Sequence, residues 1–228
     1  MFTMSKGWEK TFTILSFFAM GASYLSARVY GILHRLHHAY ADTENDPHSP
    51  KYDANPFAMM WRTKNIYHDI LRDNMEIEER FTKDLPSFPS WERIADSWPV
   101  RLSWVAIYTA FYFFFATEWW MWMFLPIHYV MGPFHGLIIN WFAHKVGYVN
   151  FKVDNTSTNL MAWDIFMLGE GYHNNHHKFS GRPNFAVKWF EFDPVYPFIA
   201  LFNWLGIIKL KTVSKEVEIP AVSEKISA

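Results

Sequence analysis

Residues 100–141 read VRLSWVAIYTAFYFFFATEWWMWMFLPIHYVMGPFHGLIINW, and this stretch decides the fold. It divides at Glu118 into two apolar segments, 100–117 and 119–141, each close to the ~20 residues that a helix needs to cross a hydrocarbon core of about 30 Å. Tryptophans fall near the predicted ends, where amphipathic rings favour the membrane interface: Trp104, Trp119, Trp120 and Trp122. The stretch predicts a transmembrane helical hairpin, with a pair of buried core helices as the alternative.

A hairpin returns the chain to the side that it left, so the residues before 100 and after 141 share one aqueous face. The turn at Thr117 and Glu118 contains no Lys or Arg, whereas both flanking segments contain many. The positive-inside rule therefore places the flanking segments in the cytoplasm. We predict an all-α integral membrane protein whose hairpin carries a cytosolic helical cap.

The remaining segments are expected to form a single domain over residues 1–228 around this hairpin. The apolar stretch 11–33 is interrupted by small and charged residues, so we expect an interfacial or protein-covered helix there. Prolines make 42–56 a turn-rich loop and 85–99 a strap, while 64–83 is compatible with a helix. The aromatic residues end at about Lys211, which predicts a flexible tail over 211–228.

Two copies of the spacing His-x-x-His-His flank the hairpin, and they use six of the 11 histidines: His34, His37 and His38, then His173, His176 and His177. Neutral imidazole is the commonest nitrogen ligand of transition metals. Positions i, i+3 and i+4 of a helix share one face, so each triplet can direct several ring nitrogens at one point. The hairpin topology allows the two triplets to meet. The duplication predicts a nitrogen-rich cage with room for more than one metal ion.

Composition excludes several classes of function. The chain contains no cysteine, which rules out thiolate clusters, haem-thiolate ligation, disulfides and catalytic thiols. The net charge of −1 lacks the basic excess of a nucleic-acid-binding protein, so no nucleic-acid partner is expected.

Further residues of the site are predicted from their position at the end of the hairpin or near the two triplets. Asn140 and His144 lie at i and i+4 at the end of the second apolar segment, where one helical face would direct both toward the site. Four carboxylates could orient imidazoles from behind: Asp42, Glu44, Asp46 and Glu170. The other histidines are expected to pack or to lie in loops and on the surface: His48, His68, His128 and His135.

Three stretches carry a resemblance to a known family: HRLHHAYADTENDPHSP, NWFAHKVGYVNF, and GEGYHNNHH followed by NFAVKWFEFDPVYP. Together they resemble the membrane fatty acyl desaturases of the bacterial Δ9 acyl-CoA type, over nearly the whole chain from about Phe2 to Lys211. The resemblance implies two iron ions at the cytosolic face of a transmembrane bundle. Carried over by position, it implies seven ligands, His34, His37, His38, His144, His173, His176 and His177, with Asn140 reaching iron through water and no catalytic residue beyond these.

The chain departs from this family before the first triplet. The family has an earlier box of the form His-x-x-x-x-His, preceded by two more transmembrane helices, and this chain has neither. MFTMSKGWEKTF resembles the segment that follows that box. We therefore expect a chain that is incomplete at its amino terminus, and one that is poorly active or inactive as written.

The resemblance also implies the chemistry and the partners. Removal of hydrogens from two unactivated methylenes needs an oxidant that no side chain supplies, and a non-haem di-iron centre can obtain one from O₂. An acyl-CoA or other acyl carrier would be the substrate, with membrane lipid around it. Electrons would come from a ferredoxin or from a cytochrome b5 with its reductase. Tyr112 and Trp141 could line the acyl tunnel, although ordinary packing is the simpler role for them.

Two other functions remain open from the sequence. A related histidine-box enzyme could hydroxylate a carotenoid, a sterol or an alkane. A non-catalytic membrane protein could instead hold a structural or vestigial zinc site, which the missing first box would favour.

Overall fold

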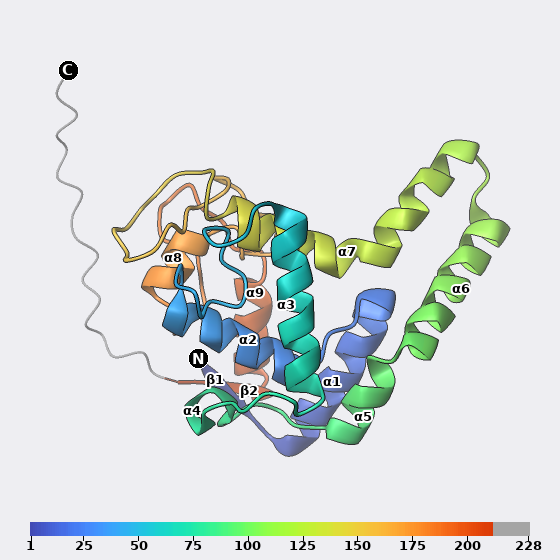
Figure 1. The fold of residues 1–228 in the computed structure, drawn as a ribbon, viewed down its shortest axis with the longest axis horizontal. Helices are drawn as coiled ribbons and strands as arrows, with labels where there is room; N and C mark the ends of the chain where they lie inside the picture. Colours follow the sequence, from blue (N-terminus) through green and yellow to red (C-terminus); the bar gives the residue numbers. More distant parts are fainter. Residues whose placement is uncertain (212–228) are drawn as a thin grey trace.

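The protein is a helical molecule with a long projecting arm, described by the computed structural model over residues 1–211 (Figure 1). The arm consists of α6 and α7, and a body built on α2 and α3 carries the loops and α8 at the opposite end. In chain order the elements are β1 Phe2–Met4, α1 Lys6–Met20, η1 Gly21–Ser23, α2 Ala27–Tyr40, α3 Pro56–Leu71, α4 Glu79–Thr82, α5 Pro89–Ala95, α6 Trp98–Phe115, η2 Trp119–Phe124, α7 Leu125–Leu137, η3 Ile138–Phe142, α8 His173–Lys178, α9 Tyr196–Trp204 and β2 Ile208–Leu210.

The arm follows the predicted hairpin, with a break where a straight second helix was expected. No residue of α6 is buried, and Leu125 is the buried residue of α7, so the apolar side chains of the arm face outward. Val130 leaves the helical conformation three residues before Pro133, which has no N–H to donate to the preceding turn. The predicted segment 119–141 is therefore a succession of a 3₁₀ turn, a kinked α-helix and the π-helix η3.

Among residues 1–211, one helical run is long and apolar enough to cross a membrane, Trp119–Phe142. A second candidate exists if Lys6–Ser23 and Ala27–Tyr40, which meet at 79°, form one broken span. The protein is thus mostly helical with one or two candidate membrane spans. That both arms of the hairpin cross the bilayer remains a prediction.

The apolar stretch 11–33 is two helices rather than one. Gly21 adopts φ 52° at the end of α1, and a side chain there would collide with Tyr108 of α6. The Ser26 hydroxyl then accepts the backbone N–H of Val29 and caps α2. The break turns the chain so that α2, which carries the first histidine triplet, is covered by protein as expected.

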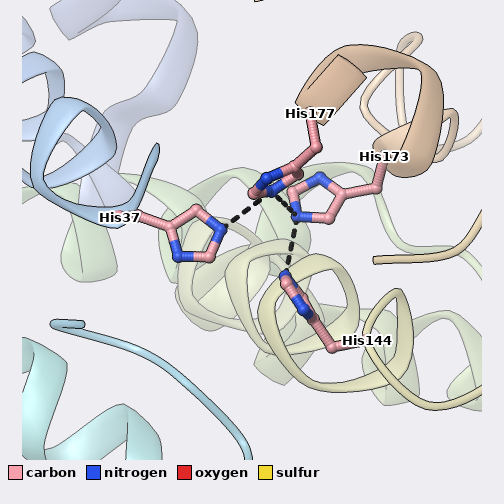
Figure 2. Close-up of side chains that lie close together, drawn as sticks. All are labelled: His37, His144, His173 and His177. Atoms are coloured by element: carbon pink, nitrogen blue, oxygen red, sulfur yellow. Dashed lines mark hydrogen bonds between the residues drawn. The ribbon is translucent and has the colours of Figure 1, made fainter. Parts of the chain in front are cut away.

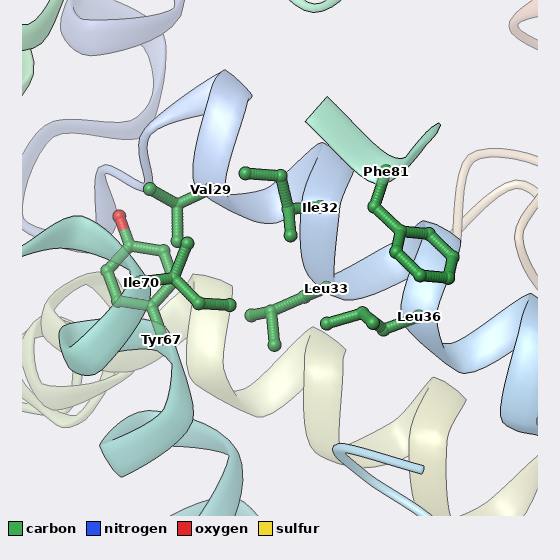
Figure 3. Close-up of a cluster of buried hydrophobic side chains, with 7 residues drawn as sticks. All are labelled: Val29, Ile32, Leu33, Leu36, Tyr67, Ile70 and Phe81. Carbon is green, nitrogen blue, oxygen red and sulfur yellow. The ribbon is translucent and has the colours of Figure 1, made fainter. Parts of the chain in front are cut away.

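The core fixes α2 against α3 and α4 (Figure 3). Its buried side chains are Val29, Ile32, Leu33 and Leu36 of α2, Tyr67 and Ile70 of α3, and Phe81 of α4. The α2 positions recur at intervals of three and four, which is one face of a helix. Burial of each such side chain contributes about 1.5–3 kcal/mol. This face anchors α2 and leaves its histidines free to face the opposite side.

Two expectations about the segments around the core were wrong in their boundaries. The helix predicted over 64–83 begins at Pro56, where the Asn55 side chain caps it, and ends at Leu71 before Asp73 adopts φ 58°. The predicted strap 85–99 contains the short helix α5, because Pro89 occupies its first turn.

The all-α prediction missed one small sheet. Strands β1 and β2 pair antiparallel, with Phe2 opposite Leu210. They are only three residues long and lie near opposite ends of the sequence, so no local pattern indicates the pairing. The predicted tail lies, beyond Lys211, outside the described residues.

Candidate metal centre

The structure brings all seven predicted histidines into two adjacent groups. The first group contains His34, His38 and His176, and the second contains His37, His144, His173 and His177. Within each group the candidate ligand nitrogens all lie within 4.8 Å of one another. Figure 2 shows the second group, where α2, α8 and the turn after η3 each point imidazole rings into one space. Both triplets contribute to both groups.

The geometry of the first group fits a bound cation better than a set of hydrogen bonds. Its Nε2 atoms are separated by 2.9 Å between His34 and His176, 3.2 Å between His34 and His38, and 2.8 Å between His38 and His176. Each nitrogen of a neutral imidazole is either a donor or an acceptor. In a closed triangle at least one pair must therefore be two donors or two acceptors. A metal ion that takes all three lone pairs removes this conflict.

The second group is a chain of close Nε2 contacts. The separations are 3.0 Å between His37 and His177, 3.0 Å between His177 and His173, and 3.0 Å between His173 and His144. His173 and His177 lie at positions i and i+4 of α8, on one face of the helix, as the spacing predicts. Four imidazole nitrogens from three segments are a donor set that a transition metal accepts.

These rings are largely removed from water and held neutral. His173 is 1% exposed and His176 is 3% exposed. Burial, and then the neighbouring imidazoles, lower the pKa of both side chains well below the usual value for histidine. A metal competes with a proton for the same lone pair, so a lowered pKa favours the form that binds metal.

Asp46 orients His37 from behind. Both carboxylate oxygens lie 3.0 Å from Nδ1 of His37, and the side chain of Asp46 is fully buried. The same carboxylate accepts the backbone N–H groups of Asp42 and His48. An Nδ1–H donated to Asp46 leaves the Nε2 lone pair directed at the second group, which is the arrangement that tunes metal-bound histidines.

Asp42 acts on His144 through a hydroxyl. Nδ1 of His144 donates to Oγ1 of Thr156 at 3.2 Å, and that hydroxyl donates to Asp42 at 2.8 Å. Burial opposes ionisation of Asp42, but the nearby His144 imidazole, 3.8 Å away, and the two hydrogen bonds from Thr156 outweigh it and hold the pKa of this carboxyl below its usual range. The sequence-based expectation that Asp42 and Asp46 stand behind imidazoles is therefore matched by contacts.

The other two predicted carboxylates do not reach an imidazole within residues 1–211. Glu44 is exposed and makes no hydrogen bond to a histidine there, so this expectation was wrong. Glu170 lines a cavity of about 860 Å³ together with the three histidines of the first group. Burial there, then the charges of Asp164 and Asp193, raise the pKa of Glu170 to about 7.

Asn140 lies in η3, the π-helix at the end of the arm. The expected shared α-helical face with His144 does not form, because the π-helix ends at Phe142 and His144 follows it in a turn. A contact of Asn140 with metal through water stays a prediction. Tyr112 and Trp141 do not line the cavity beside the first group.

His48 lies in a loop, as the sequence predicted, but it is buried beside the second group rather than on the surface. It is 6% exposed, and its ring centroid lies 4.3 Å from that of His37. Asp46, two residues earlier, fixes the turn that buries it, so the DPHSP sequence was the available signal. His128 does hydrogen bond across the arm, with Nε2 3.1 Å from the Tyr112 hydroxyl.

A buried polar network holds α8 in place. Asn174 and Asn175, which separate the α8 histidines, are 0% and 1% exposed. The Glu191 carboxylate accepts the side-chain N–H groups of Asn150 at 2.7 Å and of Asn175 at 2.9 Å. It also accepts the hydroxyl of Tyr148 at 2.7 Å. Because α8 has only six residues, these bonds rather than helical propensity position its histidines.

Two groups of histidines at the base of an apolar helical arm are consistent with a membrane protein that binds metal. The sequence profile described as fatty acid desaturase matches residues 2–200, and the chain belongs to this membrane-bound family.

Individual relatives agree with this assignment. The chain is 28% identical over 180 residues to the sn-1 stearoyl-lipid 9-desaturase of Anabaena variabilis, covering 76% of this chain and 61% of the relative. It is 26% identical to the Delta-9 desaturase-like 5 protein of Arabidopsis thaliana, over 92% of this chain and 66% of the relative. It is 29% identical to Acyl-CoA 5-desaturase AL21 of Anemone leveillei, over 81% of this chain and 55% of the relative. The chain thus spans about three fifths of the length of these relatives.

Proposed function

We propose that this protein is an O₂-dependent desaturase that introduces a cis double bond, at the Δ9 position, into a saturated acyl chain. The observation that carries the proposal is the pair of adjacent, buried, neutral imidazole groups in a chain without thiolate. Nitrogen-rich sites of this kind suit iron that activates O₂. The family membership supplies the reaction class.

The residues of this chain would perform the holding and positioning. His34, His38 and His176 would bind one iron ion, and the four histidines of the second group would bind the other. When bound, the two ions would supply the oxidising power needed to remove hydrogen from unactivated methylenes. Asp46 keeps the proton of His37 on Nδ1, and burial keeps the α8 rings neutral. Both features prepare the site before metal arrives.

We propose acyl-CoA as the substrate. The cavity beside the first group is lined by the apolar side chains of Phe81 and Leu85 and by the guanidinium groups of Arg35 and Arg80. This combination suits an apolar chain with an anionic head. The relatives named above include lipid-linked and acyl-CoA enzymes, and both Δ9 and Δ5 positions. The carrier and the position are therefore the two properties that an assay must resolve.

We further propose that the metal site faces the cytoplasm. In the described part of the chain, the loops that carry His144 and α8 contain basic residues that form no ion pair, and the tip of the arm at 116–118 contains no basic residue. A soluble electron donor, either a ferredoxin or a cytochrome b5 with its reductase, would then reach the site.

Product analysis tests the function. The full chain is produced in cells that lack their own desaturase, and their fatty acids are analysed by mass spectrometry after derivatisation that locates the double bond. We expect a Δ9 monoene, in the small amount that the sequence predicts for this chain, together with its loss in His177→Ala and its retention in His68→Ala, whose residue lies near the end of α3. Hydroxylated products, or no product from iron-loaded protein supplied with O₂ and electrons, would refute the proposal.

A further inference from the structure

The loops around α8 carry a group of basic residues whose charges are not neutralised. We call this group the basic patch: Lys145, Lys152, Lys178, Arg182 and Lys188. Within residues 1–211 none of them forms an ion pair. The same stretch has one exposed carboxylate, Asp154, whereas Asp164 is buried and Glu170 faces the cavity. The patch is therefore strongly positive although the net charge of the chain is only −1.

Contacts between the loops bring three of these residues, Lys145, Lys152 and Lys178, near the metal centre. Lys145 follows His144, and Lys178 follows His177, and the two histidine rings lie 5.4 Å apart. The ring of Phe151, next to Lys152, packs on Phe179, next to Lys178, at 4.9 Å. Figure 1 shows these loops and α8 at the end of the molecule opposite the tip of the apolar arm, the side that faces water if the arm enters the membrane.

The surface between these basic residues is joined to the metal ligands by single hydrogen bonds. Thr156 is exposed and its hydroxyl accepts from Nδ1 of His144 at 3.2 Å. The side-chain nitrogen of Asn155 lies 3.2 Å from Nδ1 of His177, which is only partly buried. From Thr156 through His144, and from Asn155 through His177, one hydrogen bond and one imidazole ring separate the surface from the second group.

We infer that the basic patch is the docking surface for a small acidic protein that carries one electron at a time, and that electrons enter through His144 and His177. The inference rests on the proposed function, since the desaturation reaction needs electrons from outside. Charge complementarity steers such encounters, and weak electron-transfer contacts use small interfaces. Lys145 and Lys178 lie beside the entry points, so a partner that neutralises them comes close to the ligands.

Charge reversal tests the inference. Lys152→Glu, Lys178→Glu and the double variant are compared with Lys209→Glu on β2, away from the patch, all iron-loaded in nanodiscs of neutral lipid. Oxidation of a reduced plant-type [2Fe–2S] ferredoxin is followed by stopped flow. Direct binding of the ferredoxin is measured in the same discs. We expect transfer to slow by on the order of tenfold for each single variant, with the wild-type rate falling steeply with salt. Reduction of the iron by dithionite should not change.

Several outcomes would overturn the inference. Equal rates in the patch variants and Lys209→Glu would do so, as would a wild-type rate that does not depend on salt. If the variants lose binding to anionic vesicles but keep their transfer rate, the patch serves lipid head groups instead. Ferredoxin binding that depends on the lysines, together with iron that dithionite cannot reduce, would support docking and reject the proposed function.

Discussion

Replacing Asp46 with asparagine removes a negative charge from behind His37 while it keeps the shape of the side chain. The carboxylate accepts three donors, the Nδ1–H of His37 and the backbone N–H groups of Asp42 and His48. An amide offers one oxygen and an NH₂ group, so at least one of these donors would face another donor. The oxygen can serve His37 or the loop, but not all of its present partners.

The magnitude follows from these bonds. A buried donor left without a partner costs about 1–3 kcal/mol, and Asp46 is fully buried, so the metal-free protein should lose that much stability. Loss of a carboxylate behind a metal-bound histidine lowers metal affinity by about 10–100-fold, or about 1.4–2.7 kcal/mol. The affinity loss should affect the ion of the second group, because His37 belongs to that group.

The assay separates these two effects with a matched variant. Asp193 is also buried and accepts backbone N–H groups, from Phe185, Val195 and Tyr196, but no histidine. Asp193→Asn should reduce the unfolding free energy without a change in metal affinity. Affinity is measured by competition with a chelator in detergent, and stability by thermal unfolding of the metal-free protein. If Asp46→Asn retained wild-type affinity for both ions, the role assigned to this carboxylate would be wrong.

Four further results are expected. His38→Ala and His144→Ala should each reduce the bound metal from two ions to one, as measured by elemental analysis, because each residue belongs to a different group. The metal-free protein should lose stability as the pH falls below about 6.5, by about 1.4 kcal/mol per pH unit for each α8 histidine whose pKa is lowered. The reason is that the unfolded chain binds protons that the folded protein does not, and a flat unfolding temperature between pH 5 and 7 would contradict it. Ile32→Ala should cost about 2–5 kcal/mol in thermal unfolding, against less than about 0.5 kcal/mol for the exposed Ile94→Ala. Gly147→Ala should prevent close approach to the Asn159 carbonyl and lower the yield of metal-loaded protein, since Gly147 adopts φ 136°.

Local patterns in the sequence predicted the ligand set but not its division. The i, i+3, i+4 spacing requires the three rings of α2 to share a face, and they do. Which ring joins which group depends on how α8 docks, and α8 is held by side chains of Asn150 and Glu191 that no helical pattern marks. The prediction for Asn140 depended on an α-helix continuing to His144, and the π-helix altered that register. Such changes depend on tertiary packing, which periodicity does not report.

The division of the triplets has a physical consequence. His34 and His38 of α2 share the first group with one histidine of α8, while His173 and His177 of α8 share the second with one histidine of α2. Each group therefore needs both helices, although more than a hundred residues separate them along the chain. The first ion to bind would restrain α2 against α8 and thereby order part of the other group. Metal binding and tertiary structure are coupled in this arrangement, because the ordering of the two helices, once achieved by one ion, need not be repeated for the next.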